Sequence, residues 1–217
     1  MEIIDFHSHT VFSDGALLPS ELARRADILG YKVLGITDHV DVSNFSIVVP
    51  AIIKFCSNYQ KYFGMKLIPG AEITHVPPQA IQKLAKEIRN LGAKIILVHG
   101  ETIVEPVAKG TNICALQSDI NILAHPGLIT EEEVKLAKKK NIFLEISGKA
   151  GHSLTNGHVA KLAKKIGANL SFGSDTHSPS NLVTKLSLHN IFIGAGLSKN
   201  EIKKIFSNMQ KLIKRLE

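Results

Sequence analysis

The sequence predicts a single α/β domain over residues 1–217, folded as a barrel of seven parallel strands with helical crossovers. Seven short apolar runs rich in Ile, Leu, Val and Phe alternate with helical patterns. No linker, internal repeat or second set of patterns accompanies them, and the length suits one domain. Side chains able to bind metal follow most of the runs, as expected where a barrel gathers its strand ends at one face.

The expected strands are apolar throughout, which suits strands buried on both faces of a parallel sheet. They cover residues 2–6, 33–37, 66–70, 94–98, 120–124, 142–146 and 169–173. An open doubly wound sheet is the alternative architecture. It would not bring the ends of all seven strands to one point, so the barrel is preferred.

Helical patterns fill the intervals between strands. The expected helices include residues 19–29, 78–91, 156–166 and about 199–216. Capping boxes that pair Thr130 with Glu133 and Ser198 with Glu201 mark two helix starts. Gly167 follows the third of these helices, where a left-handed residue commonly ends a helix.

The composition is basic, with a formal net charge of +7 and a pI near 9.4. Of 26 Lys and Arg residues, 15 follow position 130, many of them in helical patterns. Solvated outer helix faces are the preferred interpretation. A nucleic-acid footprint is the alternative, but no Trp and only three Tyr are present to stack on bases.

Membrane and secretion signals are not expected in this chain. No run reaches the roughly 18 apolar residues of a membrane span. The N-terminal residues MEIIDFHSHT enter a strand directly, unlike a signal peptide. Cys56 and Cys114 are isolated and form no disulfide framework, so a reducing, cytoplasmic location is expected.

Nine residues at or just beyond the strand ends carry ligand atoms suited to metal ions. They are His7, His9, Asp14, His39, Glu72, His99, His125, Asp175 and His177. Each alone has an ordinary explanation, such as a turn aspartate or a hydrogen-bonded core histidine. Together, at six strand ends, they predict a metal site. Imidazole and carboxylate suit zinc, manganese and iron, and the lack of Cys argues against a purely structural zinc site.

With this arrangement of residues, the chain resembles the PHP family, named for polymerase and histidinol phosphatase domains. The matching motifs are HSH at 7–9, SDG at 13–15, TDH at 37–39, AE at 71–72, H at 99, AHP at 124–126 and SDTH at 174–177. They stand in the family's order and cover nearly the whole chain. The resemblance implies a distorted (β/α)7 barrel that binds three divalent ions at the C-terminal ends of its strands.

The resemblance also implies how the nine residues divide among three ions. His7, His9, Glu72 and Asp175 would hold the first; Glu72 would bridge to a second held by His99 and His125; Asp14, His39 and His177 would hold the third. Three divalent ions exceed the charge of three carboxylates, so the site would favour a bridging hydroxide and a phosphate ester. That hydroxide would attack phosphorus in line, with Glu72, Asp175 and His177 as catalytic residues.

Three further residues are candidates for substrate binding. Lys149 and His152 lie in the segment GKAGHS after the sixth strand, where Lys149 could bind phosphate; a plain surface turn is the alternative. His75 follows Glu72 closely enough to line the same pocket. His152 or His177 could protonate the leaving group.

The sequence therefore predicts a metal-dependent phosphoesterase that hydrolyses a small phosphomonoester, with histidinol phosphate as a substrate that the family suggests. A PHP-type nuclease or nucleotide phosphodiesterase is the first alternative, in which the basic helices would have a role. A non-catalytic scaffold or nucleic-acid-binding subunit is the second. A family member with only such a role would be expected to have lost some metal ligands, whereas all nine are present here.

Overall fold

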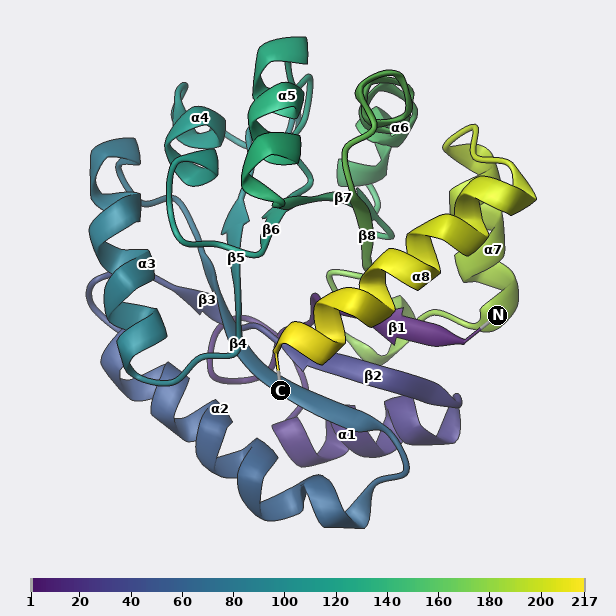
Figure 1. Ribbon diagram of the computed structural model, residues 1–217. Coiled ribbons are helices and arrows are strands. Elements are labelled where there is room, and N and C mark those ends of the chain that lie inside the picture. Colours follow the sequence, from purple (N-terminus) through teal and green to yellow (C-terminus); the bar gives the residue numbers. More distant parts are fainter. Residues whose placement is uncertain (1, 217) are drawn as a thin grey trace.

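The computed structural model describes residues 2–216 as a ring of parallel strands surrounded by helices (Figure 1). In chain order its elements are β1 (Ile3–Asp5), α1 (Pro19–Ile28), β2 (Tyr31–Ile36), β3 (His39–Val40), α2 (Phe45–Tyr59), β4 (Lys66–Ile73), α3 (Ile81–Asn90), β5 (Ile95–His99), α4 (Thr111–Leu116), β6 (Ile122–Ala124), α5 (Glu131–Lys140), β7 (Phe143–Ser147), α6 (Asn156–Ile166), β8 (Leu170–Gly173), α7 (Lys185–Gly194) and α8 (Lys199–Arg215). Short 3-10 turns occur at Gln60–Tyr62, Pro78–Ala80, His152–Thr155 and Pro179–Asn181.

Seven strands form a nearly closed ring in the order β1-β2-β4-β5-β6-β7-β8, with every pairing parallel. The short strand β3 pairs with β4 beside this path. Backbone hydrogen bonds join the two ends of the ring: Asp175 donates to His7 at 3.0 Å and His9 to Thr176 at 2.9 Å. The predicted distorted (β/α)7 barrel is confirmed, and this closure excludes the open doubly wound sheet.

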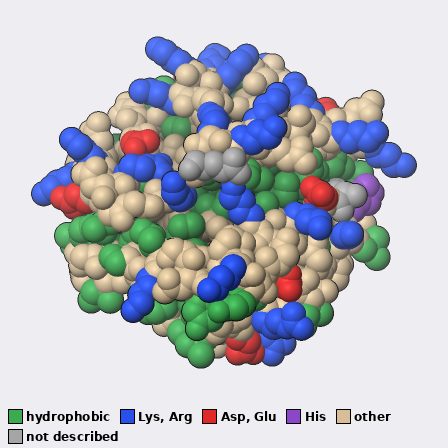
Figure 2. Space-filling model, turned by 60° about the horizontal axis from the view of Figure 1, so that its bottom comes forward, with side chains coloured by type: hydrophobic (Ala, Val, Ile, Leu, Met, Phe, Trp, Pro, Cys, Tyr) green, Lys and Arg blue, Asp and Glu red, His purple; other side chains and the backbone are tan. Residues whose placement is uncertain are grey.

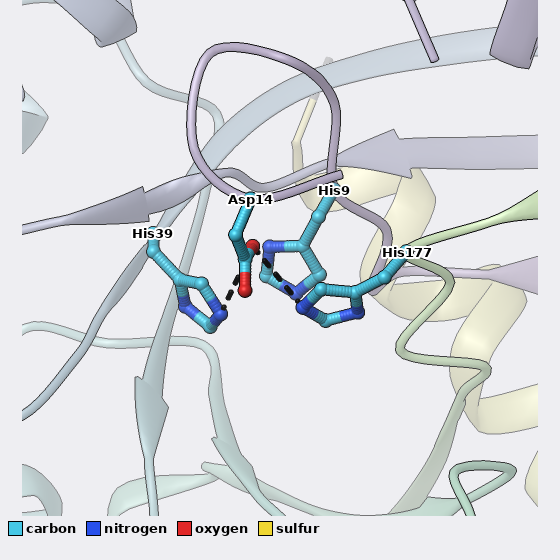
Figure 3. Close-up of side chains that lie close together, drawn as sticks. All are labelled: His9, Asp14, His39 and His177. Atoms are coloured by element: carbon cyan, nitrogen blue, oxygen red, sulfur yellow. Dashed lines mark ion pairs between the residues drawn. The ribbon is translucent and has the colours of Figure 1, made fainter. Parts of the chain in front are cut away.

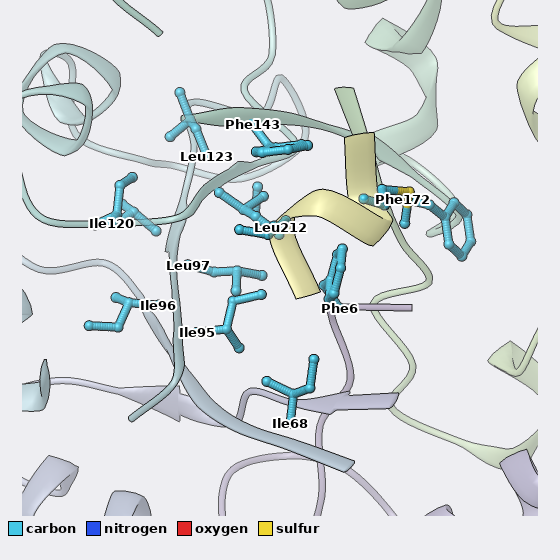
Figure 4. Packing of buried hydrophobic residues seen from close by; sticks show 14 of the residues in the cluster. Phe6, Ile68, Ile95, Ile96, Leu97, Ile120, Leu123, Phe143, Phe172 and Leu212 are labelled. Carbon is cyan, nitrogen blue, oxygen red and sulfur yellow. The ribbon is translucent and has the colours of Figure 1, made fainter. Parts of the chain in front are cut away.

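The barrel interior is filled by the apolar side chains that the strand runs supply. Phe6, Leu97 and Phe172 are fully buried and lie among the packed side chains of Figure 4. Leu212 of α8 reaches the same cluster, and the helix crosses in front of the barrel in Figure 1. Burial of this kind stabilises a fold by roughly 25 cal/mol per Å² of apolar surface.

Helix α8 covers the end of the barrel where the strands begin. Leu216, directly after this helix, shares a cavity with Leu67 near the start of β4 and with Lys94 just before β5. Ile202, near its first turn, shares another cavity with Glu2, just before β1. The opposite end, where the strands finish, is therefore the end left open for a site.

The predicted helix signals are largely confirmed. Thr130 and Ser198 each accept a hydrogen bond in a complete capping box, at the starts of α5 and α8. Gly167 ends α6 with φ 79°. Residues 78–80 form a 3-10 turn rather than the start of α3. Helix α2 was not predicted individually, because its β-branched residues and internal Pro50 oppose a helical reading.

The molecular surface is basic in places. Figure 2 shows Lys and Arg side chains spread around an apolar hollow on the face in view. On α8, the side chains of Lys203, Lys204, Lys211 and Lys214 are exposed. Within residues 2–216, every helix is too short or too polar to cross a bilayer.

Candidate active site

The nine predicted metal-binding residues converge at the open end of the barrel. Their elements follow the prediction: His7 and His9 come after β1, Glu72 lies near the end of β4 and His99 ends β5. His125 follows β6, and Asp175 with His177 follows β8. His39 begins the short strand β3, and Asp14 reaches in from the loop after His9 (Figure 3). Parallel strand ends thus bring together side chains separated by up to 170 positions.

One cluster joins His7, His9, Glu72 and Asp175, all of them almost fully buried. His7 Nε2 lies 3.1 Å from Glu72 Oε2, and His9 Nε2 lies 3.2 Å from Asp175 Oδ1. Ligand atoms of His7, His9 and Asp175 lie within 4.8 Å of one another, close enough to share a metal ion. This is the set expected around the first ion.

A second cluster surrounds the exposed carboxylate of Asp14. Its Oδ1 lies 3.6 Å from His39 Nε2 and 3.2 Å from His177 Nε2, so the carboxylate stands between two imidazoles (Figure 3). His9 lies beside them and can contribute a fourth ligand atom. The grouping contains every residue expected around the third ion.

A third cluster joins His99, His125 and His152, whose ligand atoms again lie within 4.8 Å of one another. Glu72 Oε1 lies 3.4 Å from His125 Nε2 and connects this cluster to the first. Glu105, from the loop between β5 and α4, lies 3.0 Å from His99 Nε2. Glu105 is not among the residues predicted from the sequence, so its approach to the histidines is a new observation.

Several buried atoms in these clusters make no hydrogen bond. Among the described residues they include His7 Nε2, both ring nitrogens of His9, both carboxylate oxygens of Glu72, His125 Nδ1 and Asp175 Oδ1. Buried polar atoms are normally hydrogen-bonded, because leaving one unpaired costs about 1–3 kcal/mol. Atoms of this kind, aimed at one another from separate strands, fit bound cations.

The electrostatics of the cavity are tightly coupled. Burial alone would lower the pKa of His7, but the carboxylates of Glu72, Glu145 and Asp175 outweigh burial and raise it well above its usual value. Burial would raise the pKa of Glu72, yet His7 and His39 hold it well below its usual value. Without metal, positive charge on histidines therefore balances the buried carboxylates.

Two backbone positions in the site adopt left-handed conformations that side chains seldom take. His125 has φ 25° and Asp175 has φ 53°. Each follows the end of a strand, and the turn aims its side chain back over the barrel mouth. Such conformations cost on the order of 1–3 kcal/mol and tend to occur at functional sites.

Asp38 supports the site through hydrogen bonds to Thr10 and Ser13. Its carboxylate accepts hydrogen bonds from Thr10 N at 2.7 Å, Thr10 Oγ1 at 2.8 Å and Ser13 Oγ at 2.8 Å. These bonds fix the loop that carries Asp14. The structure thus places Asp38 as the anchor of this loop.

Asp5 likewise binds backbone groups, and its burial predicts a pH effect on stability. Its Oδ1 accepts from His7 N at 3.1 Å and from Ser174 N at 3.0 Å, while burial raises its pKa from 3.8 to about 6. The folded state therefore holds this proton more tightly than the unfolded state. As pH rises from about 4 to 6, Asp5 should lower the free energy of unfolding by up to about 3 kcal/mol.

Urea unfolding of the metal-free protein at several pH values measures this effect. The difference between wild type and Asp5→Asn isolates the contribution of Asp5, and Asp119→Asn at an exposed site serves as control. A difference that stays constant from pH 4 to 6 would contradict the buried, protonated carboxyl.

Glu145 is a site residue that is not among those predicted from the sequence. It lies in β7 with only 1% exposure. Its Oε2 accepts a hydrogen bond from His7 Nδ1 at 2.7 Å, and its Oε1 accepts one from His125 N at 3.3 Å. A charged residue inside an otherwise apolar strand was the available signal, because such a residue is seldom buried without a partner.

The three predicted substrate-binding residues line one cavity of about 300 Å³ together with five of the predicted metal-binding residues. Lys149 Nζ lies 2.6 Å from His177 Nδ1 and 3.2 Å from the carbonyl oxygen of Asp175. His152 is buried, with its Nδ1 2.8 Å from Thr102 Oγ1. His75 is exposed and stands at the rim, 3.4 Å from Glu105.

Comparison with known proteins identifies the family. The model of the PHP domain matches residues 5–214. The chain belongs to the PHP family. Uncharacterized protein MJ1295 of Methanocaldococcus jannaschii is 42% identical over 215 residues, which cover 98% of this chain and 99% of that relative. A Clostridium novyi protein named Probable phosphatase is 31% identical over 193 residues, covering 81% of this chain and 79% of that protein.

Solved structures share the fold of this PHP domain. Histidinol phosphate phosphatase of Lactococcus lactis, solved with zinc, L-histidinol and phosphate, superposes with a TM-score of 0.62 at 16% identity, covering 91% of this chain and 95% of that chain. A chain of archaeal ribonuclease P with mature tRNA gives a TM-score of 0.72 at 18% identity, covering 97% and 90%. At these identities the likeness shows the fold alone. Family membership and the phosphatase relatives support a phosphoester hydrolase.

Proposed function

We propose that this PHP protein is a metal-dependent phosphatase that hydrolyses a small phosphomonoester at the open end of its barrel. The observation that carries the proposal is the set of buried ligand atoms on His7, His9, Glu72, His125 and Asp175 that make no hydrogen bond. Cations would satisfy these atoms, and their excess positive charge would favour a dianionic ligand. The cavity of about 300 Å³ suits a small substrate.

Three divalent ions, zinc, manganese or iron, fit the donor set. His7, His9, Glu72 and Asp175 would hold one; Glu72, His99 and His125 a second; Asp14, His39 and His177 a third. When bound, such ions lower the pKa of a coordinated water and neutralise charge on a phosphoryl group. Burial of Glu72 and Asp175 keeps bulk water from competing for these positions.

Lys149 is the residue that we assign to the substrate phosphate. His177 Nδ1 lies within hydrogen-bonding distance of both Lys149 Nζ and the carbonyl oxygen of Asp175, at 2.6 and 2.9 Å. If Nδ1–H donates to that carbonyl, Nε2 keeps its lone pair for a cation. The Lys149 ammonium then keeps the Asp175 carbonyl oxygen as an acceptor at 3.2 Å and has N–H donors left for a further acceptor. A phosphate oxygen in the cavity would be that acceptor.

His152 fits a binding role better than a proton-donating one. Burial, followed by the proximity of His125, lowers its pKa to about 4, so the imidazole is neutral at pH 7. A neutral imidazole cannot act as a general acid. Its Nε2 lies 3.4 Å from Glu105 Oε1 and 3.6 Å from Asp175 Oδ2, facing the cavity. We therefore assign His152 to ligand or substrate binding. His177 is already assigned to a cation through Nε2, so neither histidine is assigned as the general acid, and a bound cation would instead neutralise charge on the leaving oxygen.

A nuclease is the second candidate function. The basic surface and the fold shared with a ribonuclease P chain favour it. However, the exposed lysines of α8 lie at the end of the barrel where strands begin, whereas the candidate site lies where they finish. A strand of nucleic acid bound to α8 would not reach the cavity directly, so the phosphomonoesterase is preferred.

A substrate panel on metal-loaded protein tests the proposal. It should contain histidinol phosphate, sugar phosphates, nucleotides, an aryl phosphodiester and short oligonucleotides. Turnover of a monoester far above the diesters is expected, and chelation should abolish it until Mn²⁺ or Zn²⁺ is added back. Cleavage confined to diesters or oligonucleotides would favour the nuclease, and a fully metal-loaded protein without turnover of any member would contradict both.

A further inference from the structure

A second cavity of about 320 Å³ adjoins the metal-binding cavity and has a different character. His75 lines both cavities. Beyond it, the second cavity is walled largely by Val42, Val76, Pro77, Ala80 and Leu84. Val42 comes from the loop after β3, and the other side chains come from the segment that leads into α3 and from the first turn of that helix, so both walls begin at the barrel mouth.

The apolar wall of this cavity is accessible from solvent. Val42 is 78% exposed, whereas Val76 and Leu84 are buried beneath it at 8% and 4% exposure. An exposed valine standing over an apolar floor offers surface that a ligand can cover favourably. Concave, mostly apolar sites with a few polar groups at the edge are the usual form of small-molecule pockets.

His75 forms the boundary between the two cavities. Its imidazole lies 3.4 Å from Glu105 Oε2, and its ring centroid is 5.0 Å from that of His99. Its backbone has φ 52°, a left-handed conformation that a residue other than glycine seldom takes. A group joined to a phosphate at the histidine cluster would therefore pass His75 before it reached the apolar wall.

The charges at the edge of the second cavity limit what it accepts. Asp41 and Glu87 contribute two carboxylates, and Lys83 lies 3.9 Å from Glu87. The edge thus carries a net negative charge. A second phosphate would be repelled there, whereas an uncharged or cationic group would be accepted.

We propose that this cavity binds the apolar part of the alcohol released from the phosphomonoester, and that it selects substrates with an apolar or aromatic, uncharged or cationic leaving group. The inference rests on the proposed phosphatase function. The inference predicts that the enzyme distinguishes substrates by the size and polarity of the alcohol portion, and not by the chemical reactivity of the phosphate ester.

Two alkyl phosphates isolate this effect. Ethyl phosphate and 3-phenylpropyl phosphate both release primary alcohols, but only the second carries a ring able to reach beyond His75. The metal-loaded wild type should hydrolyse 3-phenylpropyl phosphate with a kcat/KM about tenfold or more above that of ethyl phosphate, since differential burial in the transition state sets such ratios. The gain should appear mainly as a lower KM.

Variants of the wall assign the effect to this cavity. Ala80→Phe should fill it, and Val42→Asp should replace an apolar side chain with a hydrated carboxylate that a phenyl ring covers unfavourably. Each should reduce the preference to about twofold or less while leaving ethyl phosphate turnover unchanged. Gln79→Phe, at the neighbouring exposed position outside the cavity, should retain the preference.

The outcomes separate the two proposals. Hydrolysis of both esters without preference, or a preference that survives both wall variants, would overturn the leaving-group pocket and keep the phosphatase. Absence of hydrolysis with fully loaded metal would overturn the phosphatase itself. The pocket would still be supported in that case if 3-phenylpropanol shifted or broadened the methyl NMR signals of Val42 and Leu84 in a saturable way. The effect should be lost in Ala80→Phe.

Discussion

Replacement of Glu72 by Gln is expected to reduce metal binding and to lower phosphatase turnover by at least about 100-fold. Glu72 is fully buried, and its carboxylate lies 3.1 Å from His7, 2.8 Å from His39 and 3.4 Å from His125. It therefore contacts a histidine of each cluster, and the proposed assignment makes it a ligand of two ions. Loss of groups that merely support a ligand reduces metal affinity or activity by 10–100-fold, so loss of a shared ligand should exceed that range.

Metal content by mass spectrometry and turnover of the best monoester measure the effect together. Glu132→Gln, the same substitution at an exposed position of α5, is the matched control and should behave as wild type. Circular dichroism and the unfolding midpoint distinguish loss of metal from loss of fold. A Glu72→Gln protein that kept the wild-type metal content and turnover would contradict the proposed site.

The positions of the nine metal-binding candidates could be predicted because a parallel barrel converts strand order into proximity. His7 and Asp175 are far apart in the chain. Because β1 and β8 close the ring, His7 Nε2 lies 3.8 Å from Asp175 Oδ1. Seven apolar runs were enough to predict that convergence, and the capping boxes at Thr130 and Ser198 placed two helix starts. These features depend on local sequence and on a single topology.

The remaining features depend on contacts between distant segments, which no local pattern records. Glu105 lies in the loop after β5, and only the folded structure shows that its carboxylate is 3.0 Å from His99 Nε2. The apolar cavity beside His75 has one wall near Val42 and the other near Leu84, on separate segments. Helix α2 was obscured by Pro50 and its β-branched residues, since its packing against the barrel outweighs its weak helix propensity.

Replacement of Glu145 by Gln is expected to weaken binding of the ion held by His7 by about 10–100-fold without loss of the fold. The carboxylate accepts two hydrogen bonds, from His7 Nδ1 and from the backbone N–H of His125. A proton on Nδ1 leaves His7 Nε2 with a free lone pair toward Glu72, as a metal ligand requires.

An amide cannot serve both donors. If its oxygen faces His125 N–H, its NH₂ group faces His7 Nδ1, favours the other tautomer and places a proton on Nε2. If its oxygen faces His7, its NH₂ group meets the His125 N–H. Nitrogen-15 NMR of the His7 ring reports the tautomer directly, and competition with a chromogenic chelator reports affinity.

Gly173 supplies an independent test of the same contact. A Cβ at this position of β8 would lie 2.7 Å from His7 Cβ and closer still to the Glu145 carboxylate. Gly173→Ala should therefore displace that carboxylate from His7 and weaken metal binding as Glu145→Gln does. If Glu145→Gln instead kept the wild-type tautomer and affinity, the positioning role would be wrong. If Glu145→Gln removed the ion altogether with the His7 tautomer unchanged, Glu145 would be a ligand in its own right, as its proximity to His7 and His125 also allows.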